Sequence, residues 1–172
     1  MRYVAFLRGI NVSGQKLIKM EALSTLFSSL GFKEVKTILQ SGNVVFETSE
    51  KDLRKIENKI EKGLVKKLGE VRVFARTVEQ MQKLVKLDPF SGKSEESHRY
   101  VTFLNAPFTL DLPLFSPKKD VEVFAAKEGA LFCIPHEING RYGFPNVFIE
   151  AKLKVPATTR NWKTILKVAF LE

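Results

Sequence analysis

Apolar and polar positions along the first half of the chain follow patterns that predict short strands and amphipathic helices. Tyr3–Leu7 is a continuous apolar run with aromatic residues and a valine, which is typical of a strand buried on both faces. A polar loop containing two glycines follows. Apolar residues at helical spacing from Met20 to Leu30 then predict a helix, which Gly31 ends in the left-handed conformation.

The pattern continues with a hairpin and a long amphipathic helix. Val35–Gln40 and Asn43–Glu47 predict two strands, and Ser41-Gly42 between them predicts a tight turn. A helix from about Lys51 has one apolar and one cationic face. The next elements are a strand at Val71–Ala75 and a helix at Val78–Leu87.

A repeat connects the two halves of the chain. Arg99–Leu104 repeats Arg2–Leu7 at an offset of 97 residues, with five of six residues identical. A Pro-interrupted segment then replaces the first helix, and a second hairpin and another helix follow. The same β-α-β-β-α order in both halves predicts duplication of a ferredoxin-like, split βαβ unit. The later elements are expected at Leu110–Phe115, Val121–Ala125, Ala130–Ile134 and Phe144–Lys152.

We therefore predict an α+β fold in which the two halves, about 1–87 and 98–172, pack as a single compact domain of residues 1–172. A polar linker at about 88–97 joins them, and its stretch Ser91–Ser97 is expected to be mobile. Thr158 or Thr159 is a good N-cap for a last helix that returns against the first half. Its apolar face consists of Trp162, Ile165, Leu166 and Ala169.

Composition places the chain among soluble globular proteins. Of 172 residues, 44% are apolar and 27% charged. Neither a long apolar run nor a signal peptide is present, so we expect a cytoplasmic protein without membrane contact. The single Cys133 forms no internal disulfide and lies in an apolar run, which favours a small buried residue over a nucleophile. We expect a monomer.

The positive charge belongs to the first half. The net charge is +9; residues 1–86 hold 17 Lys and Arg against 9 Asp and Glu, whereas residues 87–172 hold 11 against 10. This asymmetry favours an anionic partner, a small molecule or nucleic acid, although a basic surface also serves solubility alone. The cationic helix face consists of Lys51, Arg54, Lys55, Lys59, Lys62, Lys66 and Lys67.

Three motifs are candidates for ligand binding. Gly9–Lys16 differs from a nucleoside triphosphatase phosphate loop because its lysine is displaced by one position and Leu17 replaces the magnesium-binding hydroxyl. A simpler anion nest of backbone N–H groups beside Arg8 fits better. Gln40–Asn43 either forms the hairpin turn alone or joins Asn11 in a donor and acceptor cluster. Thr159–Asn161 at a helix start either binds an anion or only caps the helix.

Known catalytic arrangements are missing from the sequence. His98 precedes a predicted strand and His136 follows one, and neither has metal-ligand spacing to another His or a carboxylate. We expect no metal and no cofactor, and the sequence names no reaction.

The three motifs together resemble the signature of an uncharacterised, largely bacterial family, domain of unknown function 1697. Its pattern R-G-I-N-V-G-G, Q-S-G-N-V-V-F and A-T-T-R-N-W is similar to Arg8–Gly14, Gln40–Phe46 and Ala157–Trp162, with Ser13 in place of a glycine. The resemblance spans almost the whole chain. It implies two intertwined ferredoxin-like subdomains and no known activity.

From these observations we expect a binding protein for an anionic ligand, either nucleotide-like or nucleic acid. Its site would form where the first loop, the first hairpin and the start of the last helix converge. Three alternatives stay open: an enzyme that uses the same pocket, motifs that only hold the fold together, and a separate nucleic-acid surface on the helix of Lys51 to Lys67, whose binding would fall steeply with salt and tolerate Arg160→Ala. The expected ligand-binding residues are Arg8, Gly9, Asn11, Gln40, Ser41, Asn43, Thr159, Arg160 and Asn161.

Overall fold

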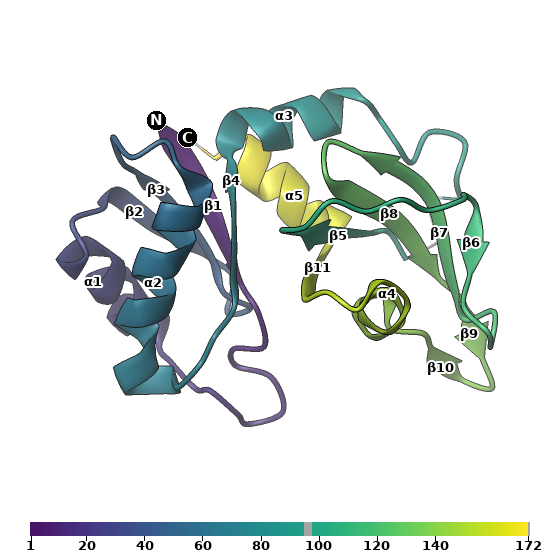
Figure 1. Ribbon diagram of the computed structural model, residues 1–172, viewed down its shortest axis with the longest axis horizontal. Helices are drawn as coiled ribbons and strands as arrows, with labels where there is room; N and C mark the ends of the chain where they lie inside the picture. Colours follow the sequence, from purple (N-terminus) through teal and green to yellow (C-terminus); the bar gives the residue numbers. More distant parts are fainter. Residues whose placement is uncertain (95–97, 172) are drawn as a thin grey trace. The chain divides into compact units, whose positions relative to one another are not determined.

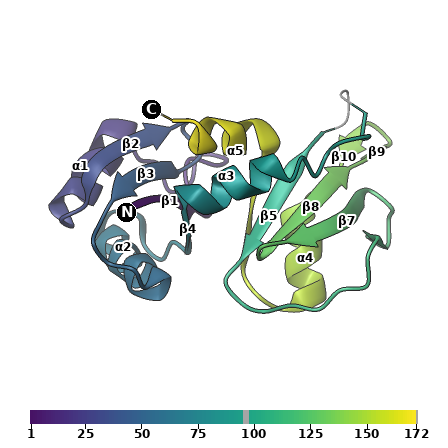
Figure 2. The ribbon, with the colours of Figure 1, turned by 90° about the horizontal axis from the view of Figure 1, so that it is seen from above.

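The computed structural model describes residues 1–94 and 98–171. The chain divides into two compact units. The first comprises Met1–Gln82 together with the chain from Lys167 on, and the second comprises Lys83–Leu166. Each unit contains an antiparallel β-sheet and helices (Figures 1 and 2). The mixed α+β class expected from the sequence is confirmed.

The first unit is a four-stranded sheet in the order β2-β3-β1-β4. β1 is central and pairs antiparallel with β3 and β4. Helices α1 and α2 cover one face of the sheet, and their apolar residues form one core with those of the strands. The elements are β1 (Arg2–Leu7), α1 (Met20–Ser29), β2 (Lys33–Ile38), β3 (Asn43–Glu47), α2 (Leu53–Leu68), β4 (Val73–Thr77) and α3 (Val78–Lys86), of which α3 belongs to the second unit from Lys83 on.

Aromatic rings fix the core under α1. Phe46 on β3 packs against Phe27 of α1, with ring centroids 5.5 Å apart, and against Phe32, with centroids 4.4 Å apart. Gly31, between Phe27 and Phe32, has a φ of 86°, so the expected left-handed end of the helix is present. α1 is thereby held with its N-terminus beside the polar loop that follows β1.

The second unit is a five-stranded sheet in the order β11-β5-β8-β7-β6. β5 pairs with β8 and β11, and α4 packs on the sheet through an apolar core that includes Cys133 and Ile149. A separate two-stranded ribbon joins β9 and β10. The elements are β5 (Tyr100–Leu104), β6 (Leu114–Phe115), β7 (Val121–Lys127), β8 (Ala130–Pro135), β9 (Glu137–Ile138), β10 (Arg141–Tyr142), α4 (Pro145–Leu153), β11 (Ala157–Asn161) and α5 (Trp162–Ala169), of which α5 belongs to the first unit from Lys167 on.

One element differs in kind from the sequence prediction. Ala157–Asn161, expected as a helix start, is the strand β11, whose register pairs Thr159 with Thr102. Two successive β-branched threonines suit a strand, and the free edge of β5 supplies the pairing that local pattern does not reveal. The last helix begins at Trp162, and its N-cap is Asn161, whose Oδ1 accepts the N–H of Lys163 at 2.9 Å.

Part of the predicted linker is packed, although Ser91, Gly92 and Ser94 are exposed. Phe90 is buried and contacts Trp162, with ring centroids 5.2 Å apart. Turns at Asp88 and Phe90 close with hydrogen bonds from Ser91 N and Lys93 N. The predicted mobile stretch includes residues 95–97, which lie outside the described residues.

Candidate functional site

The first loop folds back on itself immediately after β1. Gln15 N donates to Val12 O at 2.9 Å, which closes a two-residue turn at Ser13 and Gly14. Both turn residues have positive φ, 50° for Ser13 and 74° for Gly14. Paired positive φ values are a requirement of the tight hairpin turn that joins twisted strands. Ser13 therefore stands where a glycine would be unstrained.

Asn11 fastens this loop to its surroundings. Its Nδ2 donates to Ile18 O at 3.1 Å and to Gln40 O at 2.8 Å, while its Oδ1 accepts the N–H of Ile18 at 2.8 Å. The carboxamide thus joins the loop, the approach to α1 and the first hairpin. Both of its N–H donors are used by the backbone, so Asn11 positions the site and has little capacity left for a ligand.

The hairpin turn is tightly packed and held by side-chain hydrogen bonds. Asn43 is fully buried, and its Nδ2 donates to Ile38 O at 2.8 Å and to Ser41 Oγ at 3.1 Å. Gly42 has a φ of 77°, and a Cβ there would lie 2.7 Å from Ile10 Cγ1. Any larger residue would have to displace Ile10. Asn43 and Gly42 therefore have a structural role in the turn itself.

The remaining loop donors are partly occupied. The backbone N–H groups of Arg8 and Asn11 donate to Arg72 O at 2.9 Å and Lys16 O at 3.2 Å. Lys16 Nζ donates to Glu70 O. These groups are bonded within the chain, so they are not available to an anion, and a cradle formed by the other N–H groups of the loop stays a prediction. The Arg8 side chain is half-buried, while Gly9, Gln40 and Ser41 are exposed.

A surface hollow of about 650 Å³ opens where the first loop, the hairpin turn and the start of α1 meet. Asn11 and Gln40, two of the residues expected from the sequence, are both on its wall. The hollow combines apolar and polar surface. Its lining residues are Asn11, Leu17, Ile18, Lys19, Met20, Glu21 and Gln40.

The N-terminus of α1 faces into this region of the unit. Lys19 occupies the N-cap position, and its side chain makes no capping hydrogen bond. Helix N-termini carry a partial positive charge and N–H groups without intrahelical partners, and they attract anions. The ammonium of exposed Lys19 adds to this potential, whereas the Glu21 carboxylate opposes it. The balance suits a ligand with one anionic group and hydrogen-bond donors elsewhere.

The third motif lies in the second unit and is used by its sheet. Thr159 Oγ1 is 2.8 Å from Thr102 Oγ1 and 3.3 Å from Asn146 Oδ1. Arg160 is only 8% exposed, and its Nη1 donates to Thr158 Oγ1 and Thr159 O, both at 2.9 Å. Burial lowers the pKa of Arg160 to about 10, which leaves the guanidinium charged at neutral pH.

The expected site residues thus fall into two groups. Within the first unit the structure brings Asn11, Gln40, Ser41 and Asn43 together around the first hairpin, with Arg8 and Gly9 at the start of the loop. Thr159, Arg160 and Asn161 belong to the second unit. Convergence of both groups on one ligand stays a prediction.

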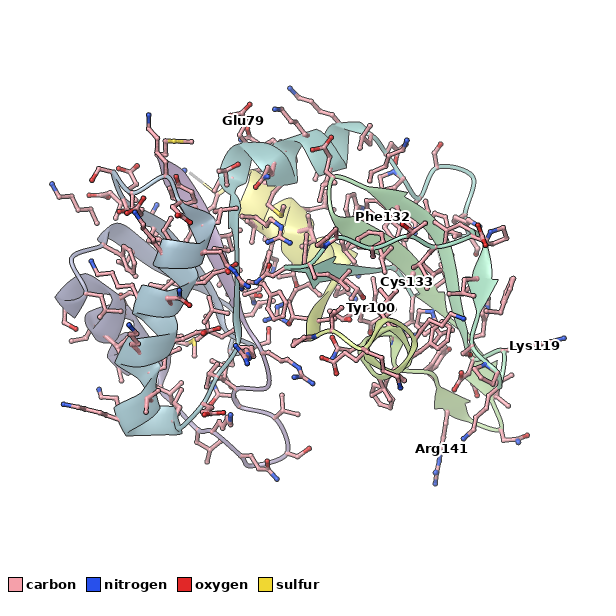
Figure 3. The ribbon with its side chains drawn as sticks, in the orientation of Figure 1. Glu79, Tyr100, Lys119, Phe132, Cys133 and Arg141 are labelled. Carbon is pink, nitrogen blue, oxygen red and sulfur yellow. The ribbon has the colours of Figure 1, made fainter. Side chains whose placement is uncertain are left out.

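The groups considered for catalysis have other surroundings. His136 Nε2 lies 3.2 Å from Glu122 Oε2, and the ring of His98 packs on Tyr142 at 4.2 Å. Neither contact involves the three motifs. Cys133 lies on β8 within the second unit (Figure 3), and burial raises the pKa of its thiol to about 12. Its expected character as a small buried residue is confirmed.

The described residues contain neither a group of side chains that could hold a metal ion nor a helix that could span a membrane. Within residues 1–94 and 98–171, no three or more His, Cys, Asp or Glu side chains are arranged to hold a metal ion. Nor does any helix in these ranges combine the length and apolar character needed to cross a membrane.

Comparison with known proteins decides the family. Residues 1–132 match the family described as Protein of unknown function (DUF1697). The chain belongs to this family. The match covers the first loop and the first hairpin, so the resemblance noted from their motifs is confirmed. A comparison with curated proteins finds no match.

A solved structure supports the fold. The conserved bacterial protein SP0830 from Streptococcus pneumoniae is similar to this chain, with a TM-score of 0.69 and 18% identity over 98% of this chain and 96% of that one. At this identity the likeness concerns the fold alone. The family and this neighbour leave the function unknown.

Sequence reasoning missed the residues that the start of α1 adds to the hollow: Leu17, Lys19, Met20 and Glu21. One signal was present. A lysine directly precedes the helix, where Ser, Thr, Asp or Asn commonly caps the first N–H groups. An uncapped helix start beside a polar loop is a pattern that can be sought in sequence.

Proposed function

We propose that this protein binds a small, nucleotide-like anion in the hollow beside the first loop. The observation that supports this most directly is the position of an uncapped helix N-terminus and Lys19 on the rim of a hollow of about 650 Å³. Asn11 and Asn43 would act as the frame that keeps the hollow open, whereas the exposed Gln40 side chain on its wall would contact the ligand.

The lining chemistry favours a nucleotide-like ligand over a polyanion. Leu17, Ile18 and Met20 offer apolar surface for a flat ring, and the helix start with Lys19 suits a phosphate or carboxylate. Glu21 can accept hydrogen bonds from ribose hydroxyls or a base amine. The same carboxylate repels a chain of phosphates, so a nucleic-acid strand fits this hollow poorly.

A thermal-shift screen against mononucleotides and sugar phosphates tests the proposal. At a hundred times its dissociation constant, a ligand stabilises by about 2.7 kcal/mol, which raises the midpoint of a chain of this size by roughly 5–10 °C. The shift should be lost in Lys19→Ala and Gln40→Ala and kept in Lys33→Ala, an exposed lysine outside the hollow.

A flat screen across these compounds would contradict the proposal and leave the motifs with a purely structural role. Asn11→Ala separates the two roles further. It removes three hydrogen bonds, so we expect a loss of roughly 2 kcal/mol in unfolding free energy whether or not a ligand binds.

We also propose that the two sheets are copies of one duplicated ferredoxin-like unit. The order β2-β3-β1-β4 corresponds to β7-β8-β5-β11, and the repeated sequence motif falls on the equivalent strands β1 and β5. Each fourth strand runs directly into a helix, β4 into α3 and β11 into α5. Shared order, sequence and connection are the pattern expected of a duplication.

A further inference from the structure

The exposed side of α2 is a row of lysines. Lys55, Lys59, Lys62 and Lys66 follow at intervals of four, three and four residues, so they share one face of the helix. All four are exposed, and the face lies opposite the buried residues Ile56, Ile60 and Leu64. At 1.5 Å per residue the row is about 16 Å long. We refer to these four residues as the lysine row.

The carboxylates of the same helix are turned away from this face. Glu57 Oε1 accepts the N–H of Ala75 at 2.9 Å, and Glu61 Oε1 accepts the N–H of Val73 at 2.9 Å. Both donors, the N–H groups of Val73 and Ala75, belong to β4, an edge strand of the first sheet. The two glutamates are therefore used by the edge of the sheet, and the outer face of α2 is more positive than its sequence suggests.

The fold makes little use of the row. Lys59 Nζ sits 5.2 Å above the ring of Phe32. Lys55 attracts the Glu50 carboxylate, and for the side chains of Lys62 and Lys66 no ion pair or hydrogen bond is found within the residues that the structure describes. Like charges four residues apart weaken a helix, so the row costs stability where it stands. An anionic partner would offset that cost.

The chemistry of the face identifies the class of partner. α2 contains no aromatic residue on which the bases of a single strand could stack. Val65 is its only large exposed apolar residue, which is too little apolar surface for a membrane-bound helix. A straight row of cations without either feature matches phosphates at regular spacing. A duplex carries one phosphate charge per about 1.7 Å of its axis when both strands are counted, so a row of about 16 Å faces a stretch with more phosphates than the row has lysines.

We propose that the lysine row of α2 binds the phosphate backbone of double-stranded nucleic acid without reading its sequence. This surface acts independently of the hollow beside the first loop. Each lysine would neutralise a phosphate and release a condensed cation. Binding would therefore be weak, tolerant of sequence and steeply dependent on salt.

Fluorescence anisotropy with a labelled 20-base-pair DNA duplex tests this. Four phosphate contacts predict a log–log slope against salt of about −3.6, which is an affinity loss of about 150-fold between 50 and 200 mM. The variant K55Q/K62Q/K66Q keeps only Lys59, so its slope should fall to about −0.9, and its affinity at 50 mM salt at least tenfold.

The matched control is K118Q/K127Q/K152Q, which makes the same change in charge at exposed lysines of the second unit. Its affinity should stay within twofold of the original chain. Far-UV circular dichroism melts check that both variants fold. Lys19→Ala should leave duplex binding unchanged, which distinguishes this surface from the hollow.

Four outcomes would overturn the proposal: no duplex binding at 50 mM salt, equal loss in the row variant and the control, tighter binding to single-stranded DNA, or tighter binding to vesicles with anionic headgroups. The last two would point to base stacking and to a membrane surface.

Discussion

Helices α2 and α4 occupy equivalent places in their units, because each follows the third long strand of its sheet, β3 in the first unit and β8 in the second. Comparing the two helices shows which of their side chains the fold requires. Both use glutamates in the same way. Glu57 and Glu61 of α2 accept N–H groups of β4, and Glu150 of α4 accepts the N–H of Ala157 on β11 at 2.8 Å. β4 and β11 are edge strands. Helix carboxylates thus cover an edge in both units.

Their outer faces have nothing in common. α2 exposes the lysine row, whereas α4 is shorter and exposes Phe144 at its N-cap and Val147 in its first turn. A unit of this kind can therefore form its helix–strand junction without a row of cations on the outer face, since α4 has only the exposed Lys152. The difference indicates that the glutamates serve the architecture and that the lysine row is available for function.

The largest expected effect concerns the core under α4. With its pKa raised from 9.0 to about 12, Cys133 should have roughly a thousandfold less thiolate at pH 8 than an unfolded chain, and correspondingly slow reaction with a thiol reagent. A folded pKa above the unfolded one also means that this group contributes stability below pH 9, which is lost as the pH rises toward 12.

Ile149→Ala, in the same core, should speed the reaction, while Ile60→Ala, in the core under α2, should not. Rapid labelling of the unchanged folded protein would show that α4 does not seal its sheet.

The second largest expected effect is a loss of stability when the glutamates that accept N–H groups of the edge strands are replaced. Glu57 is 2% exposed, so Glu57→Ala leaves a buried N–H and the nearby buried Arg76 without this carboxylate, and we expect a loss of roughly 3 kcal/mol. Glu57→Gln keeps an acceptor oxygen and should lose about half as much. Glu150→Ala, at a half-buried site, should lose roughly 1 kcal/mol.

Urea unfolding followed by circular dichroism measures these changes. The single tryptophan, Trp162, lies in the second unit and reports on Glu150→Ala by fluorescence. A loss of less than about 0.5 kcal/mol in the unfolding free energy of Glu57→Ala would contradict this account, because the helix glutamates would then not stabilise the edge strands.

The smallest effect is a gain. Lys62→Glu relieves repulsion in the lysine row and creates a favourable pair with Lys66 four residues on, so unfolding free energy should rise by roughly 0.5 kcal/mol. Lys152→Glu on α4, which has no such row, places a carboxylate in the last turn of the helix and should lower stability by a few tenths of a kcal/mol or more. Thermal melts at low salt measure both. A destabilised Lys62→Glu variant would show that the row supports the fold after all.

The sequence predicted the elements of the first unit because their apolar periodicity is strong, as in Leu53, Ile56, Ile60 and Leu64 of α2. It placed β4 two residues early, at Val71–Ala75 instead of Val73–Thr77. The segment of β11 was predicted to start a helix, because Thr159 and Arg160 become part of a strand only through pairing with β5. Local pattern does not contain that pairing.

The candidate site was predicted in part. Asn11, Gln40 and Asn43 do lie around one turn, as their motifs suggested, but hydrogen bonds to the backbone occupy Asn11 and Asn43. The sequence also does not predict that the side chains of Glu57 and Glu61 point toward β4, since their spacing suits ion pairs with neighbouring lysines equally well. Their direction depends on where β4 lies.

The most direct test of the account is a nuclear magnetic resonance titration of the isotope-labelled protein with a short DNA duplex. The account predicts that amide shifts concentrate on the outer face of α2, at Lys55, Lys59, Lys62 and Lys66, and fade as salt is raised. Shifts confined to the second unit, or spread evenly over exposed lysines of both units, would contradict the claim that the first unit presents a binding surface the fold itself does not require.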